Sequence, residues 1–579
     1  MALRVPQAGG PQLFKEGYKN LQGLEEVILR NIAATREMSE ITRTSFGPQG
    51  RNKMVVNHLG KLVVTSDAAT IIRELDVVHP AAKLLVLASQ QQEAEAGDGT
   101  NAVLIFGSEL LQRAEPLLRM GLHPSEIARG FEAALTAALA GLEELACDTV
   151  SSWTSRAEVL KAVRTAVAAK QYGQDAALAA LVADAVLAAL PARDATRFNV
   201  DNVRVVKVLG GSLAQSRVVR GMVFPTAPVT ATRRAACVRV AVFACAVDVG
   251  QTETKGTVLL RDAAALLAYT RGEEAQMDAA MAELHEAGVG AVICGGGVGD
   301  LAIHCMNRYG MVAVRCPSKF ELRRVCRVVG ATPLARLGAP TPEEMGYCDE
   351  LRTDEIGGDR VTVVRQWTPE EAAQKASEGV VRPAFAARVA ASPLATVVLR
   401  GATANALDDA ERAVDDGVNV VKALTRDARL VPGACATEMA LARLVHQAAD
   451  RTPGVAQHAI RAFAHALEVF ARTLADNAGV DSTALVAKLI AAHHAKEGDK
   501  DAGVVGPCAG FDVESDHEPR LIDAHAAGIL DPLAVKQWAL RYATHAALTV
   551  LQVDQIVMAK TAGGPKLPKQ QAGHWDNDD

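Results

Sequence analysis

The strongest constraint on the fold is the order in which two kinds of periodicity follow one another along the chain. Residues 20–145 place apolar side chains at three- and four-residue spacing, as amphipathic helices do. From residue 203 strand-like runs alternate with helices, which favours a compact α/β unit. Ala-rich helices return from about residue 400 to 495. Helix-rich ends around an α/β middle indicate a discontinuous helical domain carrying an insertion, although periodicity alone does not bring the two ends together.

Shorter segments add detail to this plan. Two alternating stretches, 52–57 and 61–66, predict a hairpin on the outside of the first helices. Gly210 and Gly211 end the first strand-like run and predict a hinge with unusual backbone torsions. Further buried strands are predicted by the apolar runs at 238–247, 290–294 and 311–316, and the segment 396–401 precedes the return to helices.

Composition excludes several classes of protein. The chain has 579 residues, too many for one core, with 49% apolar and 22% charged residues, which is typical of a globular protein. A net charge of −6 and an aromatic content of 4% argue against a nucleic-acid binder. No run of eighteen apolar residues and no secretory signal is found, so we expect no membrane partner. Ten cysteines without a C-x-x-C pair indicate reduced thiols and a cytoplasmic location.

The common nucleotide-binding signatures are absent or broken. No G-x-x-x-x-G-K-[ST] sequence occurs, which argues against a P-loop ATPase. The segment CGGGVGDLA at 294–302 follows a strand and precedes a helix, as a dinucleotide fingerprint does. However, Asp300 replaces its third glycine, so a glycine-rich turn is the better interpretation and an NAD-dependent enzyme the weaker one.

Five turns that combine glycine with acidic or small residues remain as candidate chemistry. Each has a plain structural explanation: Asp67 predicts a helix N-cap, Gly97–Asp98–Gly99 a tight turn, and Asp415 and Asp416 a solvated helix end. Phosphoryl transfer to water needs a phosphate cradle, a carboxylate for Mg²⁺ and a carboxylate that orients the water. The turns supply these groups only if distant segments converge; they lie at 45–54, 65–71, 97–101, 408–419 and 431–438.

Taken together and in order, these motifs resemble the group II chaperonins, and among them the subunits of the eukaryotic cytosolic chaperonin CCT/TRiC. The resemblance covers essentially the whole chain apart from its two tails. It rests on GPQG, TSDAATIIREL, HPAAK, GDGTN, KQYG, TETKGTVL, LRGAT, DDAERAVDDGVN, VPGACATE and VDQIVMAKTAGGPK.

The resemblance implies the chaperonin fold: a helical equatorial domain that binds ATP, a small α+β intermediate domain, and an α/β apical domain with a helical protrusion. The protrusion would span about 248–276, and Gly210–Gly211 would lie near the intermediate–apical hinge. The implied boundaries are 1–150 and 406–560 for the equatorial domain, 151–212 and 373–405 for the intermediate domain, 213–372 for the apical domain, and 561–579 for a mobile tail.

The resemblance also implies roles for individual residues toward ATP or ADP and Mg²⁺. Asp67 and Asp416 match the aspartates that position or activate the hydrolytic water, and Lys170 matches a lysine that senses the γ-phosphate. Asp98 would be the Mg²⁺ ligand. The remaining nucleotide contacts would come from Gly47, Pro48, Gly97, Gly99, Thr100, Asn101, Gly433, Ala434, Gly510 and Asp531.

Two departures from the family pattern leave an alternative open. Ala434 and Cys435 stand where the family commonly has glycine, and each adds a Cβ where backbone approaches the ribose. Ala68 stands where the family commonly has glycine after the aspartate of the TSDAAT motif. The implied function is an ATP-hydrolysing subunit of a hetero-oligomeric double ring that folds non-native polypeptides such as actin and tubulin. The alternative is a mainly structural or recognition subunit of the ring with weak ATPase activity.

Overall fold

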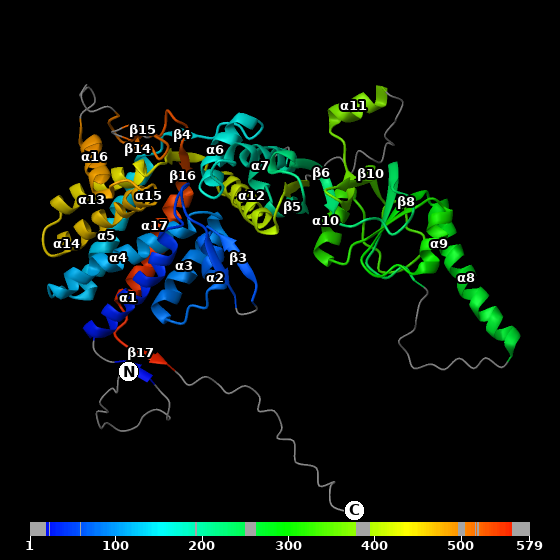
Figure 1. The fold of residues 1–579 in the computed structure, drawn as a ribbon, viewed down its shortest axis with the longest axis horizontal. Helices are drawn as coiled ribbons and strands as arrows, with labels where there is room; N and C mark the ends of the chain where they lie inside the picture. Colours follow the sequence, from blue (N-terminus) through cyan, green and yellow to red (C-terminus); the bar gives the residue numbers. More distant parts are fainter. Residues whose placement is uncertain are drawn as a thin grey trace, which may run out of the picture.

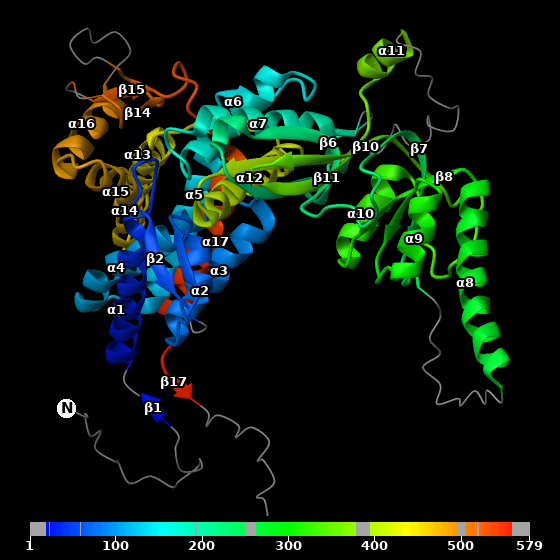
Figure 2. The same cartoon turned by 45° about the vertical axis from the view of Figure 1, so that its right-hand side comes forward.

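The fold is drawn in Figures 1 and 2 from a computed structural model of the chain. It describes residues 19–21, 24–57, 60–191, 194–248, 262–377, 394–495, 504–515, 517 and 520–558. The expected tail, 561–579, lies outside these residues, and so does the part of the expected protrusion at 249–261.

Helices from both ends of the chain form one block around a shared hydrophobic core (Figure 1). Its centre is aromatic: the Phe106 ring lies 5.3 Å from that of Phe463 and 5.8 Å from that of Phe470, centroid to centroid. The helices are α1 (Leu24–Arg43), α2 (Ala68–Glu74), α3 (Pro80–Ala96), α4 (Thr100–Arg119), α5 (Pro124–Glu144), α13 (Ala436–Arg451), α14 (Ala456–Leu467), α15 (Val469–Asn477), α16 (Ser482–His494) and α17 (Leu533–Leu551). The two helical ends of the chain therefore bury their apolar faces against each other.

Short strands complete this block. The predicted hairpin is confirmed as β2 (Lys53–Val56) paired antiparallel with β3 (Leu62–Thr65). The ends of the described chain meet in β1 (Lys19–Leu21) and β17 (Ile556–Met558), and β14 (Ala509–Phe511) pairs with β15 (Leu521–Asp523).

A second core lies between this block and the rest of the molecule. It packs α6 (Arg156–Ala168), α7 (Asp175–Ala189) and α12 (Ala404–Leu424) against β5 (Val203–Leu209) and β12 (Ala395–Gly401). The 3₁₀ turns Ala195–Arg197 and Val200–Asn202 lead into β5, and Leu213–Gln215 follows it. Because α12 contributes much of this core, the boundary expected at 405/406 falls inside one helix.

The chain passes between the first two cores through a small three-stranded sheet. Its strands are β4 (Asp148–Thr149), β13 (Arg429–Pro432) and β16 (Leu530–Pro532), in the order β16-β13-β4 and all antiparallel. The outgoing strand β4 and the returning strand β13 are thus hydrogen-bonded to each other.

One mixed eight-stranded sheet runs from the second core into the outer part of the molecule, in the order β5-β12-β6-β11-β10-β7-β8-β9. Its β5–β12, β7–β8 and β8–β9 pairs are parallel, which explains their nearly continuous apolar sequences because both faces are covered. The outer strands are β6 (Arg217–Phe224), β7 (Arg234–Phe243), β8 (Val289–Cys294), β9 (Val312–Arg315), β10 (Gly346–Ile356) and β11 (Asp359–Arg365).

Helices pack beside this outer part, and Figure 2 shows α8 extending away from the body of the molecule. They are α8 (Ala263–Glu286), α9 (Asp300–Arg308), α10 (Lys319–Val329) and α11 (Pro369–Ser377). The predicted unusual torsions after β5 are confirmed, since Gly210 has a φ of 96° and Gly211 a φ of 83°.

Candidate functional site

The turn between α3 and α4 needs both of its glycines. Gly97 ends α3 with a φ of 74°, and Gly99 caps α4 with a φ of 80°; both are left-handed conformations that disfavour side chains. A Cβ on Gly97 would lie 2.1 Å from the Cβ of Asn419 in α12. The tight turn predicted from the sequence is therefore confirmed, and it holds Asp98 between two helix ends.

The N-terminus of α4 presents unpaired backbone donors beside Asp98. Its first turn has no side-chain cap, so the leading N–H groups are available to an anion. The Gly99 N–H donates to Asp98 Oδ1 at 2.7 Å, which fixes that carboxylate. Asn101 donates its amide to the Thr42 carbonyl at 3.1 Å, so its side chain joins α4 to the end of α1.

Asp67 combines the predicted N-cap with a buried ion pair. Its Oδ2 accepts from the Thr70 N–H at 3.0 Å and from the Thr70 hydroxyl at 2.7 Å, which starts α2. Its Oδ1 accepts from Lys170 Nζ at 2.6 Å. The cap leaves one oxygen of the carboxylate for a partner from a distant part of the chain.

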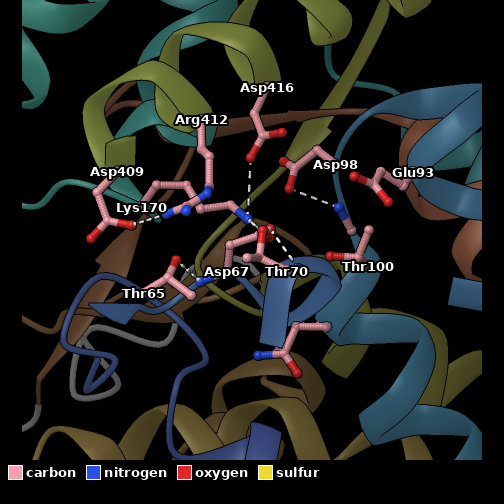
Figure 3. Close-up of polar contacts among 12 residues, drawn as sticks. Thr65, Asp67, Thr70, Glu93, Asp98, Thr100, Lys170, Asp409, Arg412 and Asp416 are labelled. Atoms are coloured by element: carbon pink, nitrogen blue, oxygen red, sulfur yellow. Dashed lines mark hydrogen bonds and ion pairs between the residues drawn. The ribbon is translucent and has the colours of Figure 1, made fainter. Parts of the chain in front are cut away.

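Lys170 brings the acidic groups together. Figure 3 shows its ammonium between Asp67 and Asp416, with Asp98 beside them. Asp416 Oδ2 lies 3.1 Å from Lys170 Nζ, and the three side chains of this pairing are 12–16% exposed. The helix end expected at Asp415 and Asp416 is wrong, because both residues lie within α12. Asp415 is exposed to solvent, whereas Asp416 is half-buried.

The acidic groups of this cluster outnumber the basic ones, because Lys170 is its one ammonium for Asp67, Asp98 and Asp416. Burial would raise the pKa of Asp67, but Lys170 and the hydrogen bonds from Lys170 and Thr70 hold it well below its usual range. Burial raises the pKa of Asp416 to about 8, since Lys170 only partly compensates and the charges of Asp67 and Asp98 add to the rise. Burial also raises the pKa of Asp98, helped by Asp531 and Asp67. Three carboxylates share one ammonium, which is the electrostatic setting that suits a divalent cation.

The cluster opens into a cavity of about 460 Å³. Segments from both ends of the chain line it, together with the end of α6. Among the predicted site residues, the cavity is lined by Gly47, Pro48, Asp98, Gly99, Thr100, Asn101, Lys170, Ala434 and Asp531. The other predicted residues, Asp67, Gly97, Asp416, Gly433 and Gly510, stand directly behind this wall rather than in it.

Gly47 and Pro48 form one rim of the cavity. Gly47 has a φ of 82°, and a Cβ there would lie 2.2 Å from Leu474 Cδ2. The Gly50 N–H donates to the Gly47 carbonyl at 3.0 Å, which closes the predicted turn.

The opposite wall carries the two departures from the family pattern. Ala434 has a φ of 52° and Cys435 a φ of 62°, in the left-handed region where glycine would be unstrained. A Cβ on Gly510 would lie only 2.8 Å from the Ala434 Cβ, so these two segments touch. Gly433 lies behind them, with its N–H donating to the Ile529 carbonyl at 2.8 Å.

Sequence reasoning missed a buried cation on this wall. Lys536 in α17 forms ion pairs with Glu438 and, at 3.0 Å, with Asp531 Oδ2. Burial lowers the pKa of Lys536, but Asp531 and Glu438 outweigh it and raise the pKa well above the ordinary value. A lysine in the first turn of a helix opposes the helix dipole, and this mismatch was the available signal.

Two amides of the glycine-rich turn after β8 are paired with backbone carbonyls. The Gly295 N–H donates to the Phe243 carbonyl at 2.8 Å, and the Gly299 N–H donates to the Val247 carbonyl at 3.0 Å. The segment connects β8 to α9, as a βα turn does. Within the described ranges, no helix is both long and apolar enough to cross a membrane.

Comparison with known proteins gives full-length matches. The chain is 52% identical to the probable T-complex protein 1 subunit theta of Schizosaccharomyces pombe, over 100% of both chains. It is 45% identical to the T-complex protein 1 subunit theta of Saccharomyces cerevisiae and 46% identical to that of Homo sapiens, again over 100% of both chains.

The sequence model of the TCP-1/cpn60 chaperonin family matches residues 38–561. The expected family, the expected fold and the expected activity of an ATP-hydrolysing chaperonin are confirmed by these matches. Because the family model matches most of the chain and the relatives align from end to end, the chain belongs to the TCP-1/cpn60 chaperonin family.

Proposed function

We propose that the chain is an ATP-hydrolysing subunit of a hetero-oligomeric chaperonin of two stacked rings, which works in the cytoplasm on non-native polypeptides such as actin and tubulin. The observation that supports this most directly is the convergence of Asp67, Asp98 and Asp416 on Lys170 beside the open N-terminus of α4. The relatives are named as subunits of T-complex protein 1, which supports assembly with paralogous chains.

The three regions of packing support a division into domains. The block that holds the nucleotide cavity is the equatorial domain, the second core is the intermediate domain, and the outer part of the sheet is the apical domain. We place α12 in the intermediate domain, since Leu407, Ala413 and Val418 belong to its core.

In this proposal the nucleotide lies in the 460 Å³ cavity with its phosphates at the N-terminus of α4. Thr100 and Gly99 line the phosphate end, whereas Ala434 and Asp531 line the far end. Mg²⁺ held by Asp98 would neutralise phosphate charge. The buried carboxylates outnumber the ammonium groups at this site, which favours binding of Mg²⁺.

Asp416 is the better candidate for the proton acceptor. Thr70 and Lys170 already occupy both oxygens of the Asp67 carboxylate, whereas Asp416 contacts Lys170 through Oδ2 alone. Asp67 then orients the attacking water through its remaining acceptor capacity. Lys170 holds both carboxylates in register and supplies positive charge toward the terminal phosphate.

Asp416→Asn tests these roles, with Asp415→Asn as its matched control on the same turn of α12. In assembled rings, we expect Asp416→Asn to bind ATP within about twofold of wild type but to release phosphate from this subunit roughly 100-fold more slowly in a single turnover. Asp415 is exposed, so its amide variant should hydrolyse ATP normally. Equal rates for the two variants would show that Asp416 is not the acceptor.

A second candidate is a ring subunit with weak ATPase activity and a mainly structural or recognition role. The left-handed Ala434 and Cys435 on the cavity wall favour it, because their Cβ atoms stand where glycine would leave room. Nucleotide occupancy of this subunit in rings at saturating ATP separates the candidates. A filled site supports the ATPase, and an empty site supports the structural role.

A further inference from the structure

Two histidines face each other across the α13–α14 hairpin, in the helical block but away from the nucleotide cavity. The register is fixed by an ion pair between Arg461 Nη2 and Asp450 Oδ1 at 2.9 Å. One helical turn away from this pair on each helix stand His446 and His465, because i and i+4 share a helix face. Their rings meet edge to face with centroids 4.6 Å apart.

Glu468 completes the group from the junction of α14 and α15. It lies three residues after His465 and therefore on the same face. The distance between His465 Nδ1 and Glu468 Oε1 is 3.1 Å. All three side chains present a ligand atom within 4.8 Å of the others.

These distances are close to those of a metal coordination shell. Zn²⁺ binds imidazole nitrogen and carboxylate oxygen at about 2.0–2.1 Å, so two ligands of one tetrahedral ion lie roughly 3.3 Å apart. His465 and Glu468 are already at this spacing, and the ligand atom of His446 lies within 4.8 Å of both. Two histidines and one glutamate form a donor set that leaves the fourth position for water.

We propose that His446, His465 and Glu468 form a binding site for one divalent transition-metal ion of the Zn²⁺ class. The ion takes the place of the hydrogen bond between His465 Nδ1 and Glu468 Oε1, and any proton on Nδ1 is released to solvent. The ion sits on a buried carboxylate, since the Glu468 side chain is 6% exposed, and it opens to solvent beside His465, which is 51% exposed.

The protonation of the group suits a cation. Burial and the neighbouring His465 lower the pKa of His446, so its imidazole is neutral and has a free lone pair near neutral pH. Burial would raise the pKa of Glu468, but hydrogen bonds with His465 and Arg472 outweigh it, so the carboxylate is charged. Asp450 raises the pKa of His446 and Arg461 lowers it, so these two neighbours oppose each other.

Arg472 supplies the outer contact that metal-ligating carboxylates commonly have. Its Nη2 donates to Glu468 Oε2 at 2.9 Å, which leaves Oε1 directed at the two imidazoles. Figure 1 shows α13 and α14 at the outer side of the helical block, which agrees with access from solvent.

The test measures zinc bound to the full-length chain after removal of metals with EDTA and dialysis against micromolar Zn²⁺ in excess Mg²⁺. His465→Gln and His446→Gln remove ligands, and His458→Gln is the matched control, because His458 is exposed on α14 outside the group. We expect each ligand variant to bind one zinc fewer per chain than wild type, and His458→Gln to bind the wild-type amount.

Co²⁺ provides a second measurement that does not depend on counting. Co²⁺ at this site should show the visible absorption of a tetrahedral nitrogen–oxygen complex, lost in His465→Gln and kept in His458→Gln. Because His465 is exposed, its substitution leaves the core intact, and far-UV circular dichroism checks that folding is unchanged. Zinc stoichiometry and cobalt absorption equal to wild type in folded His465→Gln would overturn the proposal.

Discussion

Lys170→Met is the substitution that most directly tests the electrostatics of the 460 Å³ cavity. It removes the ammonium that pairs with Asp67 at 2.6 Å and Asp416 at 3.1 Å, while keeping the length of an unbranched side chain. The pairing is largely shielded from water, so losing one partner of such a pair costs about 3–5 kcal/mol. We expect a loss in this range at pH 8.

The dependence on pH gives the prediction its sign. In wild type the folded-state pKa of Asp67 lies below its unfolded value, so Asp67 stabilises the fold above pH 4 and loses this contribution as the pH falls further. Without Lys170 burial raises the pKa of Asp67 above its unfolded value, and the carboxylate destabilises the fold above pH 4 instead. The difference between the proteins should therefore shrink as the pH falls from 8 to 5.

Urea unfolding of the full-length chain at several pH values measures this difference. Lys161→Met is the matched control, because Lys161 lies on α6 and pairs with Asp148 near the surface, where such a pair contributes about 0–1 kcal/mol. The reasoning is refuted if Lys170→Met is no less stable than Lys161→Met at pH 8, or if its deficit is the same at pH 5.

Three further predictions follow from backbone strain and burial. Gly97→Ala should lower the free energy of unfolding in urea by about 2–4 kcal/mol, because the cost of a left-handed φ adds to that of a 2.1 Å collision. Gly173→Ala is the control: its φ is 83° and no atom lies within 4 Å, so it should cost only about 1 kcal/mol. Equal losses in the two variants would contradict the role of the collision. Ala434→Gly relieves the strain of a left-handed alanine but makes the unfolded chain more flexible, and these two effects nearly cancel, so stability should change by under about 1 kcal/mol. ATP affinity in a fluorescence titration should rise about threefold, because the Cβ is removed from the cavity wall. Weaker binding would contradict this steric argument. Burial lowers the pKa of His493 to about 4, so protonation favours the unfolded chain below pH 6.5. About 2 kcal/mol of stability should therefore be lost between pH 7.5 and 5. If His493→Gln loses as much stability over this range, the loss comes from other groups.

Local chemistry was predictable wherever short-range rules decide it. The left-handed Gly97 and Gly99, the cap at Asp67 and the hairpin at residues 53–65 all follow from neighbouring residues. Asp416 was misjudged because its sequence context resembles a helix end, whereas tertiary packing places it within α12 against Lys170. Convergence of this kind depends on contacts between distant segments, and only the family resemblance anticipated it.

Two further features were beyond local reasoning for different physical reasons. The position of Lys536 in the first turn of a helix is unfavourable, but nothing in its neighbourhood shows that Glu438 and Asp531 surround it. The single eight-stranded sheet was also not foreseen, since periodicity identifies strands but not their order. Both features require knowledge of which segments meet.

The three-stranded sheet β16-β13-β4 limits how the two large parts of the chain can move. Both covalent crossings between the first and second cores run through β4 and β13, which are hydrogen-bonded to each other. Because the two crossings are hydrogen-bonded to each other, they move together rather than independently. The third strand, β16, carries Asp531 on the cavity wall. This end of the cavity is therefore joined directly to the strands that connect the two cores, so a ligand that contacts Asp531 also contacts the connection between them.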